Sequence, residues 1–426
     1  MIDNNINNPK SSKYYIKKYF IFIIIVFGLF MRLIWTDDME WKGDEKQMYD
    51  MAHEAADKFV LPATGMGSGG GIVNPGMSVG VFAIIAAFTN DPLAMDKTVQ
   101  IINVISILCF LLFVFLKIDP KEKEIWLAGI ALAAVSPLAV LFSRKIWAQD
   151  LLPIFSFFII LTNFYRSKGW SAFLWGLTGA IIGQVHMSGF FFAFGLFVFS
   201  LVHDYYNKIR FRWKYWIAGS LIGSISLVPW ISFLINNPHI TNVSFWNIFQ
   251  FNFYIYWFLD SLGLNIYYSL REDFWLFIRE PVIIGIPTYI VAVMHLFLVV
   301  TSIFTLNKIM KYMYKIFYQL KQKTFLESFF IGMSITKFYL FSILLGLGIF
   351  LTLSGTTICQ HYLICAFPFS YIFLAKMLRQ HKKLLHTVII AQMLITATFL
   401  FYIHKNNGAE QGDYGKSYHA QVEKGK

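Results

Sequence analysis

The chain has 426 residues, of which 57% are hydrophobic and only 14% are charged, and its mean hydropathy is +0.56. A soluble globular domain carries a charged fraction of about 25%, so this composition excludes an ordinary soluble protein and predicts an all-α polytopic membrane protein. The formal net charge of +12 does not require a nucleic acid partner, because loop lysines that orient a membrane protein produce the same excess. The three cysteines form neither a disulfide framework nor a metal-ligand pattern.

Apolar runs recur along the chain from the N-terminus onward. Lysines precede the first run, and no small-residue cleavage site follows it, so we interpret it as a retained first span. The runs cover about 20–36, 76–89, 99–116, 125–142, 151–165, 171–186, 188–202, 215–235, 282–305, 338–353, 361–378 and 386–403. The runs 171–186 and 188–202 meet at His186-Met187-Ser188-Gly189, which predicts a tight helical hairpin.

The run at 76–89 decides the orientation of everything that follows it. At about 14 residues it is short for a span, which needs ~20. If it does not cross, most Lys and Arg of the loops fall on the side of the N-terminus, and most acids fall on the other side. The positive-inside rule therefore favours an interfacial or re-entrant helix at 76–89, about eleven spans, a cytoplasmic N-terminus and an outer C-terminus.

This topology predicts a single transmembrane domain over 1–405. Its main connections are a first outer loop at 37–98 with interfacial helices, an outer loop at 236–281, and a basic cytoplasmic loop at 306–337. A short outer tail at 406–426 follows, which either packs over the outer loops or is a loose end. The polar features gather on the outer face, where we expect any chemistry to take place.

The first outer loop contains Trp41-Lys42-Gly43-Asp44-Glu45, within the densest group of carboxylates in the chain. A carboxylate within hydrogen-bond reach of a hydroxyl can act as a general base, so Asp44 and Glu45 are the candidate catalytic residues. Adjacent residues point in different directions, so we expect only one of them to face a substrate. The alternative is a hydrated rim on a loop helix.

Three basic residues are candidates for binding a phosphate. Arg144 and Lys145 lie at the outer face, against the positive-inside trend, and Arg binds phosphate in a bidentate manner. A snorkelling pair, or a salt bridge to Asp150, is the alternative. Arg32 lies near the outer end of the first span, where a charge is costly and indicates either function or a structural ion pair with an acid of the first loop.

Four further polar side chains accompany Asp150 as candidate substrate-binding residues: His186, Gln360, His361 and Tyr362. Each can hydrogen-bond a sugar hydroxyl or a phosphate, although a single histidine at a helix end is often structural. No His-x-x-x-His pair or other metal-ligand spacing occurs. The sequence does not decide whether a divalent cation is a cofactor. The glycine-rich stretch 65–71 follows no strand and precedes no Lys, so it is not a P-loop.

Together these motifs resemble the GT-C superfamily of integral membrane glycosyltransferases, with the branch of bacterial aminoarabinose transferases and protein O-mannosyltransferases most similar. The motifs are Arg32, Asp44-Glu45, Asn74-Pro75-Gly76, Ser143-Arg144 with Asp150, Gly183-x-x-His186 and Gln360-His361-Tyr362. The resemblance covers most of 20–205 and, more weakly, 355–420. One departure is that some relatives have Lys-Pro-Pro where this chain has Asn74-Pro75-Gly76, so the lysine thought to meet the lipid phosphate is absent.

The resemblance implies transfer of a hexosyl or pentosyl group from a polyprenyl-phosphate donor at the outer face of the cytoplasmic (inner) membrane. It implies that Asp44, with Glu45 beside it, activates the acceptor hydroxyl, and that Arg144 and Lys145 hold the phosphate as its charge develops. The expected partners are the lipid-linked sugar, membrane lipid, and an acceptor glycan, lipid or protein. A transporter or flippase of a lipid-linked saccharide and a non-catalytic assembly subunit are the alternatives.

Overall fold

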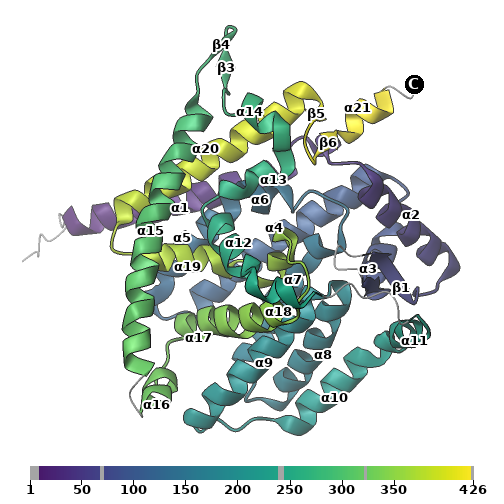
Figure 1. The fold of residues 1–426 in the computed structure, drawn as a ribbon, viewed down its shortest axis with the longest axis vertical. Coiled ribbons are helices and arrows are strands. Elements are labelled where there is room, and N and C mark those ends of the chain that lie inside the picture. The colour runs from purple at the N-terminus through teal and green to yellow at the C-terminus, as the bar shows by residue number, and fades with distance from the viewer. Residues whose placement is uncertain (1–8, 68–71, 238–243, 321–323, 424–426) are drawn as a thin grey trace, which may run out of the picture.

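A computed structural model of the chain describes residues 9–67, 72–237, 244–320 and 324–423, with side chains from residue 19 onward. The described chain is mostly helical and has very little sheet, which is consistent with the predicted all-α class (Figure 1). Its strands form three short antiparallel ribbons. These pair β1 (Thr64–Gly67) with β2 (Val73–Pro75), β3 (Val282–Ile283) with β4 (Ile286–Pro287), and β5 (Gly408–Ala409) with β6 (Gly415–Lys416).

Six helical segments of the described chain are long and apolar enough to cross a membrane. They are α4 (Pro92–Lys117), α9 (Ser188–Tyr206), α10 and α11 (Trp213–Ser224 and Val228–Asn236), α15 (Ile290–Leu320), α17 and α18 (Ile335–Phe341 and Gly348–Leu353, joined by the π-helix η7, Ser342–Leu347), and α20 (Lys382–Asn406). A seventh arises if η8 (Gln360–Ala366) and α19 (Phe369–Leu378), which are bent by 82° at their junction, form one broken span. The molecule is therefore a helical membrane protein, but the expected count of about eleven spans is not confirmed.

Two of the remaining predicted spans are interrupted or short in the structure. The predicted span 125–142 is divided at Ser136-Pro137, because proline has no N–H to continue the helical hydrogen bonds. The predicted span 151–165 yields a helix of 13 residues. The other helices are α1 (Pro9–Leu33), α2 (Gly43–Lys58), α3 (Met77–Ala86), α5 (Pro120–Val135), α6 (Pro137–Leu141), α7 (Leu152–Phe164), α8 (Gly169–Val185), α12 (Asn252–Ser261), α13 (Tyr267–Leu270), α14 (Phe274–Phe277), α16 (Phe325–Phe330) and α21 (Tyr418–Glu423). Short helical turns are η1 (Thr36–Asp38), η2 (Ala148–Leu151), η3 (Ile225–Leu227), η4 (Phe245–Phe249), η5 (Leu264–Ile266) and η6 (Arg271–Asp273).

Local sequence signals explain several of these boundaries. Asp91-Pro92 and Asp119-Pro120 each begin a helix, because the aspartate accepts a hydrogen bond from the first turn and proline suits the first helical position. Helix α8 ends at Val185 and α9 begins at Ser188, so the tight hairpin predicted there is confirmed. Gly189 permits the turn, since a Cβ on it would lie 2.3 Å from the carbonyl oxygen of Ile182.

The apolar segment 76–89 forms α3, whose ten residues are only about 15 Å long. This length is half the hydrocarbon thickness of a bilayer, so α3 is too short to cross it. It packs against α2 and α8, and its buried side includes Val79 and Phe82. Helix α3 is thus an apolar part of the first loop, packed between α2 and α8.

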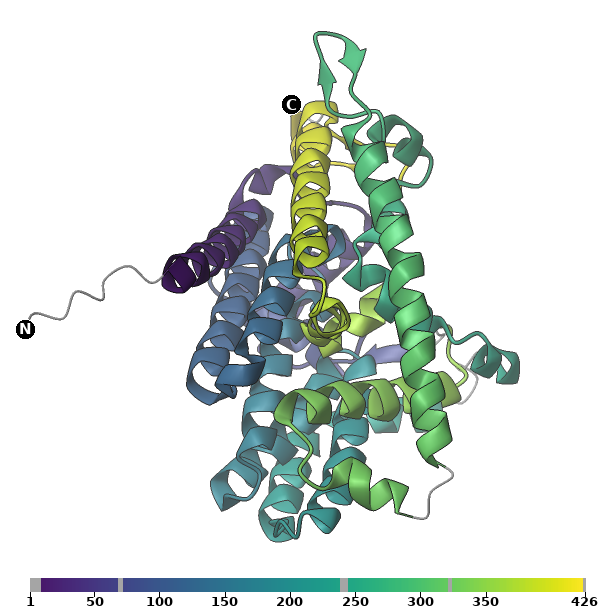
Figure 2. The same ribbon diagram turned by 90° about the vertical axis from the view of Figure 1, so that its left-hand side faces the viewer.

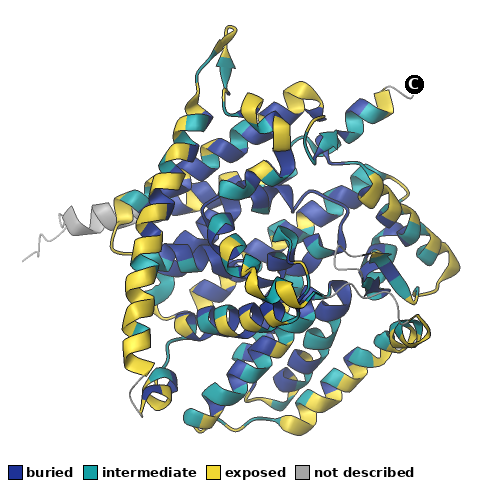
Figure 3. Cartoon of the chain, in the orientation of Figure 1, coloured by how far each residue is buried: buried dark blue, intermediate teal, exposed yellow. Residues whose placement is uncertain are grey.

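Two connections expected to be loops contain substantial helix. In 236–281, α12 packs against α18, α19 and η8, with Phe253 and Trp257 fully buried, because its aromatic residues fill the space between these helices. In 306–337, α15 continues as helix to Leu320. Figure 2 shows α20 between α1 and α15, and Figure 3 shows exposed residues along α10, α11 and α15. Their exposed side chains are largely apolar, as expected where a helix faces lipid.

The C-terminal tail packs over the first loop rather than extending from the molecule. After α20, β5 and β6 form a ribbon and α21 follows it near η1 (Figure 1). An isolated antiparallel bridge joins Glu40 to Ser417, and the backbone N–H of Tyr418 donates to the carbonyl of Met39 over 3.0 Å. The tail therefore contributes to the same region as Asp44.

Candidate functional site

One cavity brings together several of the predicted site residues. It encloses about 530 Å³ of empty space, including its open mouth, and we call it the Trp147 cavity. Its walls come from α2, the β1–β2 ribbon, α3, the turn before α7, the α8–α9 turn and η8. They are formed by Asp44, Met48, Met66, Gly67, Asn74, Ser78, Trp147, Ala148, Gln149, His186 and His361.

The two adjacent acids of the first loop have different environments. Asp44 is exposed in the first turn of α2 and lines the cavity, where a helix N-terminus favours a carboxylate. Glu45 is fully buried and does not line it. Among the described residues, only one oxygen of Glu45 has a hydrogen-bond partner: Oε2 accepts from the backbone N–H of Lys42 over 3.1 Å. Burial, followed by the nearby Glu40, raises the pKa of Glu45 to about 7.

Three buried polar atoms of residues in the cavity wall have no hydrogen-bond partner among the described residues. They are Nε1 of Trp147, Oδ1 of Asn74 and Nδ1 of His361. The indole N–H is a donor, the amide oxygen is an acceptor, and the imidazole nitrogen can be either. Because an unpaired buried polar group is costly, a ligand or water that reached these atoms would need both donors and acceptors.

Aromatic rings enclose the inner end of the cavity. The rings of Trp147 and His361 lie 5.6 Å apart edge to face, and His186 lies 5.7 Å from His361. Tyr362 packs against His186 with centroids 5.1 Å apart. The Nδ1 atom of His186 accepts the backbone N–H of Ser188 over 3.3 Å, and burial lowers the pKa of His186 to about 4, so this imidazole is neutral. It is therefore suited to hydrogen bonding rather than to holding an anion by charge.

A chain of alternating charges lies behind Trp147, and we call it the charge chain: Lys145, Glu40, Lys42 and Asp413. The Lys145 ammonium is 1% exposed and pairs with Oε2 of Glu40. Oε1 of Glu40 lies 2.6 Å from the ammonium of Lys42, which in turn lies 3.0 Å from the carboxylate of Asp413. Lys145 also lies 4.5 Å from the centre of the Trp147 ring. Lys145 is thus already neutralised by Glu40, and a phosphate would have to compete with that carboxylate.

The two arginines predicted to bind the donor phosphate contact backbone carbonyls. Arg144 donates to the carbonyl of Met31 over 2.9 Å and to that of Trp35 over 2.6 Å, at the C-terminal end of α1. Arg32 donates to the carbonyls of Gly28, Ala133 and Ala134. The carbonyls of Met31, Ala133 and Ala134 lie in the last turn of a helix, where they lack intrahelical partners. The contacts therefore give both guanidinium groups a structural role in holding α1 against α5 and α6.

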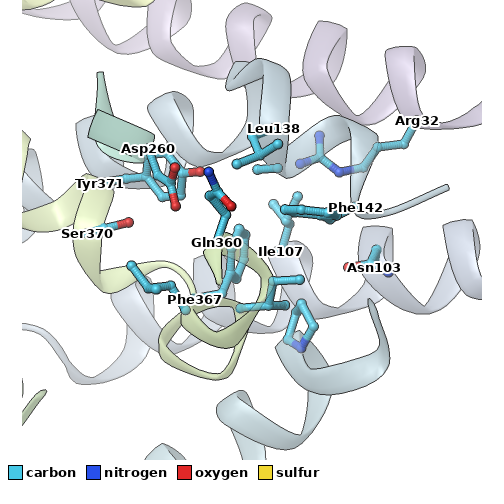
Figure 4. Close-up of a pocket in the computed structure, with 14 residues that line it drawn as sticks. Arg32, Asn103, Ile107, Leu138, Phe142, Asp260, Gln360, Phe367, Ser370 and Tyr371 are labelled. Carbon is cyan, nitrogen blue, oxygen red and sulfur yellow. The ribbon is translucent and has the colours of Figure 1, made fainter. Parts of the chain in front are cut away.

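A second cavity of about 540 Å³, including its mouth, is lined by residues that include Arg32, Asp260 and Gln360 (Figure 4). Gln360 lines this second cavity with Asp260, whereas His361 lines the Trp147 cavity. Burial raises the pKa of Asp260 to about 8. The two predicted substrate-binding neighbours therefore belong to different cavities on either side of η8.

Asp150 lies in η2 and is completely buried. Neither of its carboxylate oxygens has a hydrogen-bond partner among the described residues. Burial raises its pKa well above the ordinary value, with the acids Glu45 and Glu40 adding to the effect. The salt bridge between Arg144 and Asp150, which was the alternative interpretation of the sequence, does not form among the described residues. Within the described ranges, no group of three or more His, Cys, Asp or Glu side chains is arranged to hold a metal ion.

The structure also identifies site residues that the sequence reasoning had not selected. Trp147 and Asn74 line the cavity, while Glu40 and Asp413 complete the charge chain. Glu40 was visible in the sequence as one of the first-loop acids, but nothing in the sequence distinguished it from its neighbours.

No protein-family model, no curated protein and no solved structure matches this chain. The function proposed below therefore depends on the residues of the Trp147 cavity and on the resemblance in the sequence motifs.

Proposed function

We propose that the protein is a membrane glycosyltransferase that moves a sugar from a polyprenyl-phosphate donor to an acceptor hydroxyl in the Trp147 cavity. The observation that carries the proposal is the combination of an exposed carboxylate, an aromatic wall and three unpaired polar atoms around one cavity. A sugar presents apolar C–H faces that pack on aromatic rings, and it presents hydroxyls that both donate and accept hydrogen bonds.

In this proposal Asp44 is the catalytic base. Its carboxylate takes the proton of the acceptor hydroxyl, and the freed oxygen forms a bond to the anomeric carbon of the donor sugar. The bond between that carbon and the phosphate oxygen breaks, and the polyprenyl phosphate leaves with the electron pair. Glu45 is buried away from the cavity, so the structure favours Asp44 for this role.

Lys145 is the cation that we assign to the leaving phosphate, because it lies 4.5 Å from the centre of the Trp147 ring. It does not line the cavity, so we assign it an effect through space, and the phosphate must compete with Glu40 for it. Negative charge on the phosphate grows as the bond breaks, and a preorganised cation stabilises that charge. Glu40 holds Lys145 in the absence of the donor. Arg144 and Arg32 support this region by fixing α1.

The lipid part of the donor suits the surroundings of the site. Helices α10 and α11 carry apolar side chains on their exposed sides, as lipid-facing helices do, and α11 packs against β1 of the cavity wall. By the distribution of loop charges, we place the site on the outer face of the cytoplasmic membrane. The acceptor is a glycan, a lipid or a protein that presents a hydroxyl there.

A transporter or flippase of a lipid-linked saccharide is the second candidate. The observation in its favour is the 82° bend between η8 and α19, beside the second cavity, because transporters place broken helices at their binding sites. Purified protein in liposomes distinguishes the two candidates: a transporter moves the labelled lipid-linked sugar across the bilayer without any acceptor, whereas a transferase consumes it only when an acceptor is present.

Asp44→Asn tests the assignment of the base. We expect a loss of transfer of at least ~100-fold, because general bases contribute about 10²–10⁴-fold. The assay follows the label from a polyprenyl-phosphate sugar into acceptor material in membranes that contain the full-length protein. Asp50→Asn, an exposed acid on the same helix that does not line the cavity, is the matched control and should retain full transfer. Near-normal transfer by Asp44→Asn would overturn the assignment of Asp44.

A further inference from the structure

We propose that the C-terminal segment Gly412–Gln421 is part of the transfer site, and that Asp413 is a positioning residue for the first turn of α2. The inference rests on the function proposed above, since it concerns the placement of Asp44. Asp413 does not line the Trp147 cavity, so any effect it has on the reaction passes through other residues.

The backbone of the segment pairs with the residues that lead into α2. Glu40 and Ser417 form an antiparallel bridge, and the N–H of Tyr418 donates to the carbonyl of Met39 over 3.0 Å. The side-chain amide of Gln421 donates to the carbonyl of Trp41 over 2.6 Å. Residues 39–41 are therefore held along their length by a part of the chain about 380 residues away.

Asp413 adds a charged contact at the next residue of the first loop. Its carboxylate lies 3.0 Å from the ammonium of Lys42, and its backbone carbonyl also accepts from that ammonium. On its other side the same ammonium lies 2.6 Å from Glu40. Burial alone lowers the pKa of Lys42, but Glu40 and Asp413 raise it, so Lys42 stays charged between two carboxylates.

The segment is itself fixed to the body of the protein. A Cβ on Gly412 would lie 2.5 Å from the carbonyl oxygen of Ser269 and 2.7 Å from that of Leu270, so the chain passes in direct contact with this backbone. The N–H of Tyr414 donates to the carbonyl of Ser269 over 3.0 Å, and its hydroxyl donates to the carbonyl of Asp38. The backbone on both sides of Asp413 is thus held in place, which fixes its carboxylate beside Lys42.

Lys42 transmits this placement to Asp44. It precedes the first residue of α2, its N–H donates to Glu45, and its carbonyl accepts from the N–H of Lys46 over 3.0 Å. Asp44 lies two residues further along the same turn and lines the cavity. A shift of Lys42 therefore changes the position of the Asp44 carboxylate relative to the acceptor.

Asp413→Asn in the full-length protein is the primary test, with Asp413→Glu as the conservative variant. The matched control is Glu410→Gln, because Glu410 lies two residues before this segment and its one ion pair among the described residues is the exposed pair with Lys416, at 3.3 Å. Hydrogen–deuterium exchange in detergent micelles measures the protection of peptides that cover residues 39–49. The transfer assay then separates kcat from KM for the donor.

We expect Asp413→Asn to increase exchange in 39–49 about fivefold, because a half-exposed charged contact contributes about 1 kcal/mol. It should lower kcat about fivefold or more with little change in KM, and Asp413→Glu should recover part of the loss. Glu410→Gln should change neither quantity. A loss of general stability alone would not give this separation of kcat from KM or this recovery.

Gly412→Ala provides a second test that leaves every charge in place. Its Cβ has no room beside Ser269 and Leu270, so it should displace the segment and raise exchange in 39–49. Unchanged exchange in both Asp413→Asn and Gly412→Ala, or raised exchange with unchanged kcat, would overturn the proposal. If exchange responds but the unaltered protein transfers no sugar, the contact between the segment and α2 stands and the proposed function fails.

Discussion

Removing the carboxylate of Glu40 should destabilise the protein more than removing the ammonium of Lys145, although the two groups form one ion pair. Lys145 is 1% exposed, and Glu40 is the one carboxylate of the described chain within ion-pair distance of it. Glu40 has two cationic partners, because Lys42 lies 2.6 Å from its other oxygen. Glu40→Gln therefore leaves a buried ammonium without a partner, whereas Lys145→Met leaves the carboxylate paired with Lys42.

The expected magnitudes follow from this asymmetry. Breaking a buried ion pair by removing one partner costs about 3–5 kcal/mol, and we assign this cost to Glu40→Gln. Glu45 limits it, because loss of Glu40 removes a neighbouring negative charge and allows Glu45 to ionise near Lys145. Lys145→Met should cost about 1–2 kcal/mol, since Lys42 remains and the methionine side chain fills the apolar space beside Trp147 and Phe142.

Equilibrium unfolding of the purified protein in detergent micelles measures both free energies and that of the double variant. The double variant Glu40→Gln/Lys145→Met should be more stable than Glu40→Gln alone, because it no longer buries an unpaired charge. Lys382→Met is a control for a lysine whose ion pair with Glu124 is exposed, and it should change stability by less than about 1 kcal/mol. A larger loss in Lys145→Met than in Glu40→Gln, or strictly additive losses in the double variant, would refute the reasoning.

Two further predictions concern the buried groups of the first loop. Because burial raises the pKa of Glu45 to about 7, the folded protein binds this proton more tightly than the unfolded chain, and stability contributed by Glu45 falls as the pH rises from about 4.5 to about 7. At pH 8, Glu45→Gln should therefore unfold at a higher denaturant concentration than the unaltered protein, because its free energy of unfolding should be larger by roughly 1–3 kcal/mol. This difference in free energy should vanish below about pH 4.5. A difference that is constant across this pH range would contradict the assignment. Arg144→Lys should lower the free energy of unfolding by about 2 kcal/mol through its two carbonyl contacts, while the exposed Arg279→Lys should not. An Arg144→Lys variant with normal stability but weakened donor binding would instead assign the guanidinium to the donor phosphate.

The sequence was sufficient for those parts of the fold that depend on short-range patterns. Composition and long apolar runs predict a helical membrane protein, and the residues His186 to Gly189 predict the α8–α9 hairpin. The short run at 76–89 could be distinguished from the spans because a helix of this length is too short to cross the hydrocarbon layer of a bilayer. The number of spans was not predictable in the same way, since interruptions such as Ser136-Pro137 and the bend after η8 divide runs that look continuous by hydropathy.

The candidate site was predictable only in part. Asp44, His186 and His361 line one cavity, whereas their predicted place at the outer face of the membrane stays a prediction. Gln360 lies in the other cavity, because consecutive residues of the η8 turn face different sides. The roles of Arg144 and Arg32 depend on the acceptors that lie within hydrogen-bond distance of their guanidinium groups. In the folded chain these acceptors are backbone carbonyls at the ends of α1 and α5. A sequence reports that an arginine is present, but not whether its donors are already occupied.

The contact between Lys42 and Asp413 also has a consequence for biosynthesis. The first loop emerges early, yet the residue that secures it is made 371 positions later. At a synthesis rate of about 5–20 residues per second, this interval lasts roughly 20–75 s. During that time Lys42, Glu40 and the start of α2 are without their partners from the tail, so the site acquires its final shape only after nearly all the spans are in place. A ribosome-stalled chain that ends before Gly408 should therefore expose 39–49 to protease, although its earlier helices have already inserted.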